Sequence, residues 1–457
     1  MSEPTTKSPS VPSAPSVVPT LLRRREVIEA LRRGTVPRRG LELFAIGMER
    51  FEKLDEEFDS VAAGRGIFKA LRGDFGCGKT FAARWLQRRA QNLGLATAEV
   101  QISENDTPLH KLETVYRRAM ESLATKEWER GSFPSLIESW FFSLEQEVFA
   151  SGVRPDDEKA VTEAVGALLE GRLKEVSAIQ PQFAAALRAC HTARVKGDNA
   201  EAEGLMAWLM GQPNVGADIK RRAGIKGDLD HTGALAFLRG VLTVLRQTGR
   251  GGLMLVLDEV ETIQRVKADS REKSLNALRQ FVDYLYDQHF PGLYVLITGT
   301  PAFFDGAQGI RRAEALAMRI HVDFSGDPKF DNTRDAQIRL LPFDHAKLVE
   351  VGRRVREIYP SRVPARIAAR VTDDVVDALA RGVTGKLGGK TGVAPRIFLR
   401  KLVCDILDKV DEHEDYDPKV HFKLVVEATE MTAEEREAAG RSVDDIDIDV
   451  TGKGNEP

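Results

Sequence analysis

The amino-acid sequence predicts an α/β protein built around a central parallel sheet. Two runs, 253–257 and 293–298, are almost wholly apolar, which is typical of strands covered on both faces of a sheet. Earlier strands are expected over 66–73, where an apolar run ends at a glycine, and over 96–102. A helical pattern at 274–287 separates the two apolar runs, so the alternation of strand and helix that a parallel sheet requires is intact.

The helices are predicted from apolar residues at intervals of three and four. Between 107 and 247 the pattern is almost wholly helical, which is far more than a crossover between neighbouring strands needs. We therefore expect an inserted helical module there. The other expected helices lie at 23–31, 48–58, 81–93, 274–287, 344–358, 372–381 and 395–410.

The sequence suggests a division of the chain into four parts. The first residues are rich in Ser, Pro and Thr, and the last are dominated by Asp and Glu with few apolar residues, so both ends are expected to be largely disordered. The expected parts are a disordered arm at 1–20, a nucleotide-binding core at 21–342 with its helical insertion at about 107–230, a helical lid at 343–411 and an acidic tail at 412–457.

A glycine-rich motif follows the first strand. Residues 73–80, Gly-Asp-Phe-Gly-Cys-Gly-Lys-Thr, match G-x-x-x-x-G-K-[ST] at each fixed position. A loop that wraps a triphosphate must direct successive backbone N–H groups at anionic oxygens, which favours the positive φ and missing Cβ of glycine. Lys79 can then reach the β- and γ-phosphates, and the Thr80 hydroxyl can ligate Mg²⁺.

The helix expected after this motif would place the phosphates at a helix N-terminus, where the dipole favours anions. An ordinary glycine-rich turn is the alternative, but the flanking strand and helix favour a phosphate site. The predicted phosphate-binding residues are Gly73, Asp74, Phe75, Gly76, Cys77, Gly78, Lys79, Thr80 and Phe81.

Two adjacent carboxylates, Asp258 and Glu259, follow the strand 253–257. Ligands of open α/β sheets bind beyond the carboxyl ends of the strands, so these acids and the glycine motif could face one site. Asp258 would hold the Mg²⁺ that Thr80 ligates, and Glu259 would accept a proton from the water that attacks the γ-phosphate. A solvated Asp-Glu turn is the alternative.

Three further residues are candidates for the same chemistry. Thr298 closes the next strand and could orient the attacking water, although threonine is also common where a strand enters a turn. Arg319 precedes an expected edge strand at 320–324 and could stabilise transition-state charge in a neighbouring subunit's site. Arg396 follows Pro395 at an expected helix start and could reach the γ-phosphate. Either arginine could instead be an ordinary exposed residue.

Composition limits the class of protein. No apolar run approaches the length of a membrane span. The three cysteines, Cys77, Cys190 and Cys404, are too few for a disulfide framework and lack metal-site spacing. With no signal peptide at the start, they indicate the reducing cytoplasm. Cys77 could be a redox switch, because helix N-termini lower thiol pKa values, but a small residue is all that its position needs.

Direct contact with DNA is left open. The net charge of −3 argues against a uniformly basic nucleic-acid binder but not against a local basic patch. Arginines cluster at 23–25, 38–39, 221–222 and 353–354. Solvated helical faces have the same composition, so these clusters do not decide the question.

The motifs together resemble those of AAA+ ATPases, especially the initiator- and STAND-like branch with a helical lid after the sheet. The sequences of residues 34–40 (Gly-Thr-Val-Pro-Arg-Arg-Gly), 71–80 and 298–301 (Thr-Gly-Thr-Pro) are similar to those of BREX-system ATP-binding proteins of the BrxD type. The resemblance implies an AAA+-like P-loop fold with a central parallel sheet and a C-terminal helical lid, to which the helical pattern adds a large helical insertion. It also implies residue roles: Gly73 to Thr80 for phosphate, Asp258 and Glu259 as the acidic pair, Thr298 as the polar sensor, Arg319 as the finger and Arg396 as the lid sensor.

By this resemblance the protein would be a component of a bacterial anti-phage system. It would hydrolyse ATP with Mg²⁺, assemble into a homo-oligomer with shared sites, and act on DNA or on a DNA-bound partner. Such partners would include a helicase or a methyltransferase of the same system. The stretch between Ile102 and Leu253 is much longer than a compact AAA+ core needs, so no pore-loop residue is assigned.

Two other functions remain open on the sequence. The chain could be a nucleotide-gated scaffold or assembly module with little intrinsic hydrolysis, because a transition-state arginine can be absent or come from a partner. It could also be a small-molecule kinase with the same glycine motif. That reading lacks an evident acceptor-binding lid, and Glu259 beside Asp258 favours water as the nucleophile.

Overall fold

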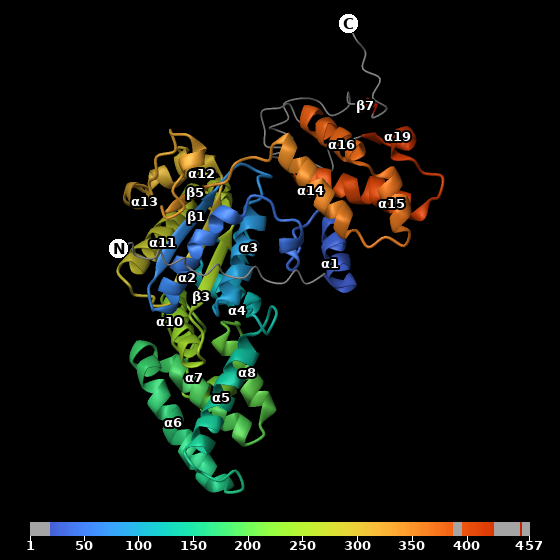
Figure 1. The fold of residues 1–457 in the computed structure, drawn as a ribbon. Helices are drawn as coiled ribbons and strands as arrows, with labels where there is room; N and C mark the ends of the chain where they lie inside the picture. The colour runs from blue at the N-terminus through green and yellow to red at the C-terminus, as the bar shows by residue number, and fades with distance from the viewer. Residues whose placement is uncertain (1–18, 387–394, 425–447, 450–457) are drawn as a thin grey trace, which may run out of the picture.

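The computed structural model describes residues 19–386, 395–424 and 448–449 (Figure 1). Its centre is a five-stranded sheet in the order β2-β3-β4-β1-β5, and all the neighbouring strands in it are parallel. The α/β fold with a central parallel sheet is therefore confirmed. The strands of this sheet are β1 (Ile67–Arg72), β2 (Ala96–Gln101), β3 (Leu253–Asp258), β4 (Leu293–Gly299) and β5 (Gln337–Arg339).

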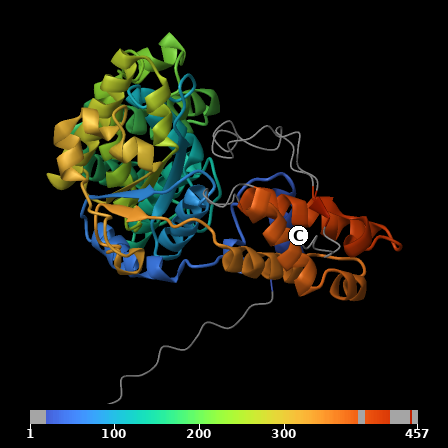
Figure 2. The same ribbon diagram turned by 90° about the horizontal axis from the view of Figure 1, so that it is seen from above.

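Helices cover both faces of the sheet (Figure 2). Alternate residues of β3 and β4 point to opposite faces, and every residue of both strands is buried. On one face, Met254 and Tyr294 pack with the helices α2 (Asp55–Ala62) and α3 (Lys79–Asn92). The other face packs against α4 (Leu112–Ser122), α10 (His231–Gln247), α11 (Ala268–Tyr286) and α13 (Glu314–Arg319).

The predicted insertion is a bundle of helices that projects from one end of the sheet (Figure 1). Its apolar core is continuous with the core on that face of the sheet. The rings of Phe183 and Trp208 lie 5.0 and 5.1 Å from that of Phe237 on α10, the helix that leads back into β3. The helices of this bundle are α5 (Phe133–Ala150), α6 (Glu158–Ile179), α7 (Pro181–Val195), α8 (Asn199–Leu209) and α9 (Ala217–Arg222).

The C-terminal helices form a second apolar core beside the sheet (Figure 1). The helix α1 (Leu21–Arg32) belongs to this core, although the sequence assigned it to the nucleotide-binding core. The guanidinium of Arg32 donates two hydrogen bonds of 2.9 Å to the carboxylate of Asp408. The other helices are α14 (His345–Ile358), α15 (Pro364–Arg370), α16 (Asp373–Lys386), α17 (Pro395–Arg400), a π-helical turn at Lys401–Leu407 and α18 (Asp408–Glu412).

The predicted edge strand at 320–324 is wrong. These residues form no strand in the described part of the chain, and β5 takes the edge position beside β1. The ring of Phe324 lies 4.8 Å from the guanidinium of Arg72 and 5.0 Å from that of Arg339. These cation–π contacts hold the segment across the strand ends instead of along the sheet.

A buried lysine explains why β5 forms where it does. Lys69 of β1 is buried, and its ammonium donates hydrogen bonds of 3.2, 3.0 and 2.9 Å to the carbonyls of Thr333, Arg334 and Asp335, which lie just before β5. It also donates to Glu57 of α2 at 2.7 Å. The lysine therefore draws this segment to β1, and the sequence pattern does not reveal that contact.

The chain beyond α18 is only partly described. Residues 412–424, which fall in the predicted acidic tail, include the helix α19 (Pro418–His421) and the strand β6 (Lys423–Leu424), with Phe422 and Leu424 buried in the C-terminal core. The strand β6 pairs antiparallel with β7 (Ile448–Asp449). The predicted arm, apart from its last two residues, and the rest of the tail lie outside the described residues. Within the described residues, no helix has both the length and the apolar character needed to cross a bilayer.

Candidate functional site

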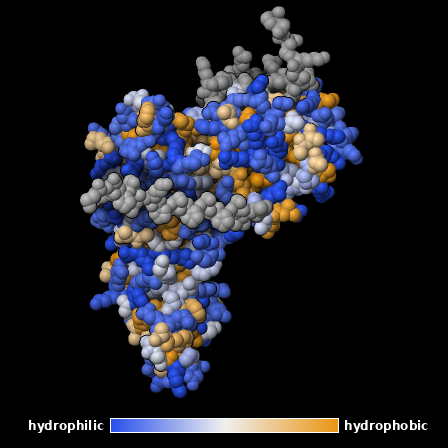
Figure 3. Space-filling model, in the orientation of Figure 1, coloured by the Kyte–Doolittle hydropathy of each residue, from blue (hydrophilic) through white to orange (hydrophobic). Residues whose placement is uncertain are grey.

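A cavity of about 430 Å³ lies where the glycine motif, the loop after α1 and the C-terminal helices meet. Residues 75–81 of the glycine motif and α3 line one end. The other end is mostly apolar, and Figure 3 shows apolar surface between the core and the C-terminal helices. The apolar lining residues include Leu31, Phe44, Ile46, Phe343, Val351 and Leu399.

The glycines of the motif are required by the backbone conformation or by the space around them. Gly76 and Gly78 have φ of +78° and +94°, the left-handed region that side chains rarely adopt. A Cβ on Gly73 would lie 2.4 Å from the sulfur of Cys77. Gly78 is also the N-cap of α3 and offers no side chain to the first N–H groups of that helix. These groups are therefore available to an anion such as phosphate.

The side chain of Lys79 folds back over the loop. Its ammonium donates hydrogen bonds to the carbonyls of Gly73 and Asp74 at 2.9 and 3.2 Å. Gly73 and Asp74 thus contribute to the loop through their carbonyls and do not line the cavity. The ammonium also lies 5.0 Å from the centre of the Phe75 ring. A cation is therefore held at the mouth of the glycine loop.

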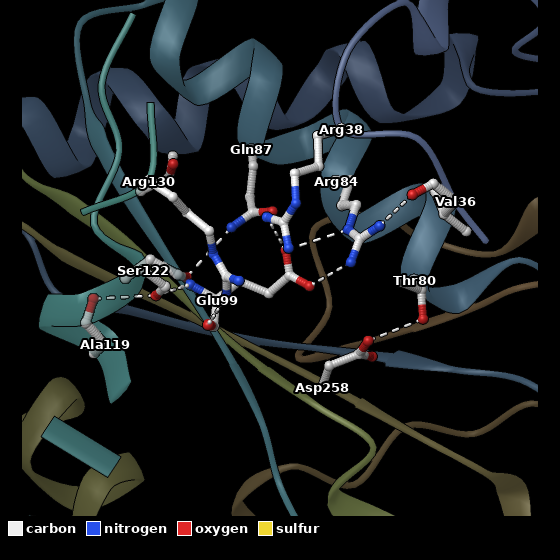
Figure 4. Close-up of polar contacts among 12 residues, drawn as sticks. Val36, Arg38, Thr80, Arg84, Gln87, Glu99, Ala119, Ser122, Arg130 and Asp258 are labelled. Carbon is white, nitrogen blue, oxygen red and sulfur yellow. Dashed lines mark hydrogen bonds and ion pairs between the residues drawn. The ribbon is translucent and has the colours of Figure 1, made fainter. Parts of the chain in front are cut away.

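The glycine motif and the acidic strand end meet directly. The Thr80 hydroxyl donates a hydrogen bond of 2.9 Å to one oxygen of Asp258 (Figure 4). The Thr298 hydroxyl donates to the other oxygen at 2.5 Å. It also accepts a hydrogen bond of 3.0 Å from the backbone N–H of Glu259. Because Thr298 is 0 % exposed, its hydroxyl positions the two acids and does not contact solvent in this arrangement.

Glu259 has an unusual backbone. Its φ of +59° lies in the left-handed region, which costs a non-glycine residue about 1–3 kcal/mol. The bonds that hold it are the N–H donation to Thr298 and a hydrogen bond of 2.9 Å from the Thr262 hydroxyl to its carbonyl. Gln101 donates to its carboxylate at 2.9 Å. Glu259 also lines the cavity.

A third carboxylate, Glu261, was not identified from the sequence. It is 5 % exposed, lines the cavity, and lies 3.5 Å from the Lys79 ammonium, while neither of its oxygens has a hydrogen-bond partner. Burial raises the pKa of Glu261, although the charge of Lys79 opposes this shift. The only sequence signal was the spacing Asp-Glu-Val-Glu over 258–261, which places Glu261 on the short helix Val260–Arg265.

The loop after α1 forms another wall of the cavity. Gly34, Thr35, Val36 and Pro37 all line the cavity. A residue of α3 holds the backbone of this loop in place, because the guanidinium of Arg84 donates a hydrogen bond to the carbonyl of Val36 (Figure 4). The Gly and Pro in this stretch are typical of a turn, but they do not indicate which cavity the loop lines.

The two predicted arginines lie in different places. Arg396, in the first turn of α17, lines the cavity, and its side chain lies within 3.6 Å of a Cβ built on Gly34. Arg319 ends α13 on the face of the sheet opposite α3 and lies 2.5 Å from a carboxylate oxygen of Asp283 on α11. The fold therefore does not bring Arg319 into the cavity of its own chain.

The redox alternative for Cys77 does not fit its surroundings. The thiol is buried, and this burial raises the pKa of Cys77 to about 11, against the opposing effect of Lys79. The side chain is therefore a neutral thiol at physiological pH, which reacts slowly with oxidants. Its small volume fills the space beside Gly73.

The oxygen atoms of Thr80 and Asp258 fit a hard divalent cation. Mg²⁺ is usually held by one or two protein oxygens together with phosphate oxygens and water. No group of three His, Cys, Asp or Glu side chains suited to a metal ion occurs in the described part of the chain. The donors present therefore fit a metal held jointly with a nucleotide.

Comparison with known families agrees with this geometry. The model of the family described as BREX system ATP-binding protein BrxC/D matches residues 21–426. The match covers the sheet, the insertion and the C-terminal helices. No curated protein matches the chain significantly.

The buried carboxylate gives a prediction for the nucleotide-free protein. The folded state raises the pKa of Glu261, so it binds this proton more tightly than the unfolded state and loses stability as pH rises above about 4.5, the ordinary value. Glu261→Gln should therefore increase the free energy of unfolding at pH 7, and the gain should shrink toward pH 4.5. Urea denaturation at several pH values measures this.

The control is Glu272→Gln, which removes the same charge from an exposed residue of α11 outside the cavity. It should not show this pH-dependent gain. A Glu261→Gln protein that is less stable than wild type at pH 7 would contradict the interpretation and indicate that the Lys79 pair is net stabilising.

Proposed function

The chain belongs to the BrxC/D family of BREX system ATP-binding proteins, and we propose that it is an Mg²⁺-dependent ATPase of the AAA+ type. ATP binding and membership of the BREX defence system follow from the family. Hydrolysis to ADP and phosphate is our proposal. The observation that carries it is the Thr80–Asp258 hydrogen bond, which joins the glycine motif to the acidic strand end at 2.9 Å.

Each residue of the site has a role in this proposal. The glycine loop and the N-terminus of α3 bind the phosphates, and Lys79 leaves its carbonyl partners to contact the β- and γ-phosphates. Thr80 and Asp258 would hold Mg²⁺, which supplies positive charge to the phosphate oxygens. Glu259 accepts a proton from the attacking water, while Thr298 keeps both acids in place.

The apolar end of the cavity suits the nucleoside. Ligand pockets combine apolar walls with a few polar groups that fix orientation. Phe44 and Phe81 contact each other at 5.3 Å between ring centroids and both line the cavity. The base would lie between the loop after α1 and the C-terminal helices, and Arg396 of α17 would reach the γ-phosphate from the same side.

We further propose that subunits share their sites in a homo-oligomer. Arg319 lies on the far face of its own sheet and is 39 % exposed, as expected of a group that serves a neighbouring subunit. A head-to-tail interface repeats such a contact around a ring. The expected partners are other subunits of the BREX system, and the proposed target is DNA or a DNA-bound partner such as a helicase. We place this activity in the cytoplasm.

A nucleotide-gated scaffold is the second candidate. It is favoured by the ion pair of Arg319 with Asp283 and that of Lys79 with Glu261, because both hold charged groups away from a bound phosphate. A chain in this state would bind ATP without rapid turnover.

Removal of the proposed base tests hydrolysis directly. Glu259→Gln should bind ATP with wild-type affinity and reduce the turnover rate by about 10²–10⁴, because only the proton acceptor is lost. A phosphate-release assay measures turnover, and titration with a fluorescent ATP analogue measures binding. The control is Glu272→Gln, an exposed residue of α11. Wild-type turnover in Glu259→Gln would exclude Glu259 as the base.

Mixing two inactive variants tests the shared site. Arg319→Ala should retain ATP binding and lose turnover by roughly 10³, the lower bound for an arginine finger. Mixed with Glu259→Gln, it should regain part of the activity, because some interfaces then combine an intact Glu259 with an intact Arg319. Arg312→Ala, an exposed neighbour, serves as the control. If no mixture regains activity although the variants co-assemble, Arg319 does not act across subunits.

A further inference from the structure

We call the 430 Å³ cavity of the proposed ATP site the nucleotide cavity. A second hollow, of about 480 Å³, lies beside it. It is bordered by the end of α1, the loop after it, α3 and the segment before α5, and we call it the arginine groove. The described residues that line it include six arginines, four glutamates and no lysine. The arginines are Arg33, Arg38, Arg39, Arg84, Arg88 and Arg130.

The centre of the arginine groove holds more positive than negative charge. Three guanidiniums surround Glu99 of β2 (Figure 4). Arg84 contacts its carboxylate at 2.8 Å and Arg38 at 3.9 Å, while Arg130 donates to its backbone carbonyl at 3.4 Å. One carboxylate therefore faces three cations.

The surplus charge is partly shielded from water. Burial, followed by the charge of Arg130, lowers the pKa of Arg38. Burial and the charge of Arg39 likewise lower the pKa of Arg88, whose guanidinium donates to the neutral amide of Gln91 at 2.7 Å. Holding like charges together in a hollow costs free energy, which a bound anion would recover. The groove is thus arranged for an anionic ligand.

We propose that the arginine groove binds the phosphodiester backbone of nucleic acid. Guanidinium forks match phosphate oxygens, and phosphate contacts need only well-placed cations. A protein partner would usually supply an aromatic or apolar anchor to a pocket, and none of the described residues that line the groove is aromatic. This inference deepens the proposed function, since it gives the surface through which the chain would contact DNA.

The arginine groove and the nucleotide cavity share a wall. Thr35, Val36 and Pro37 line both hollows. Arg84, at the floor of the groove, lies one helical turn after Thr80 and hydrogen-bonds the carbonyl of Val36. A backbone bound in the groove would therefore contact elements that also contact the nucleotide. Any effect of DNA on ATP affinity must be matched by an equal effect of ATP on DNA affinity.

The experiment measures binding of the full chain to a short fluorescein-labelled duplex, and to a single strand of it, by anisotropy over a salt series. Arg38→Gln/Arg130→Gln removes two groove cations that are more exposed than Arg84. We expect about tenfold weaker binding at moderate salt and a slope of log affinity against log salt that is smaller by about 2. Arg38→Lys/Arg130→Lys keeps both charges and should retain most of the affinity.

The matched control is Arg221→Gln/Arg222→Gln, which removes the same charge from α9 in the insertion. It should change the affinity less than twofold. Equal losses of DNA affinity in the groove variant and the control variant would overturn the proposal. Unchanged DNA binding by the groove variant, or no DNA binding by the wild-type protein, would also overturn it. Preferential displacement of the duplex by poly-glutamate would also overturn it, in favour of an acidic protein partner.

The proposal for the arginine groove and the proposal of ATPase activity can be contradicted independently of each other. Wild-type protein that binds the duplex through the groove but does not release phosphate would overturn the ATPase and support the groove. Wild-type protein that hydrolyses ATP while the groove variant binds DNA normally would overturn the groove alone.

Discussion

The site depends on the contact of Thr80 with Asp258. The two residues are separated by 178 positions along the chain, and only the parallel sheet brings them together. The strands β1 and β3 both end at the same edge with β4 between them, so Thr298 of β4 lies where it can hydrogen-bond Asp258 and Glu259. The meeting of the glycine motif with Asp258 and Glu259 therefore follows from strand order, and each local motif supplies one part of it.

The inserted bundle does not disturb this arrangement. It enters after α4 and returns through α10, both of which pack on the same face of the sheet, so its core extends that of the sheet. The opposite face packs against α2 and α3. The nucleotide cavity lies between that face and the C-terminal core, to which α1 is bound by the Arg32–Asp408 pair. Movement of the C-terminal core would therefore alter the cavity through both α1 and α17.

Local patterns were sufficient for much of the fold and the site. The glycine motif, the buried strands and the Asp258–Glu259 pair were predicted because each is encoded within a few residues. Glu261, β5 and the loop at 34–37 were missed, since their roles arise from contacts with Lys79, Lys69 and Arg84, which are distant in sequence. The segment 320–324 was wrongly predicted as a strand, because Ile320 packs in the core and Phe324 lies against Arg72 and Arg339 without strand pairing.

The most direct measurement is a structure of the chain with a non-hydrolysable ATP analogue and Mn²⁺ in place of Mg²⁺, with the metal located by anomalous scattering. We expect one manganese peak at about 2.0–2.2 Å from the Thr80 hydroxyl, adjacent to Asp258 and to the β- and γ-phosphates. A peak at another edge of the sheet, or phosphates bound away from Lys79, would contradict it.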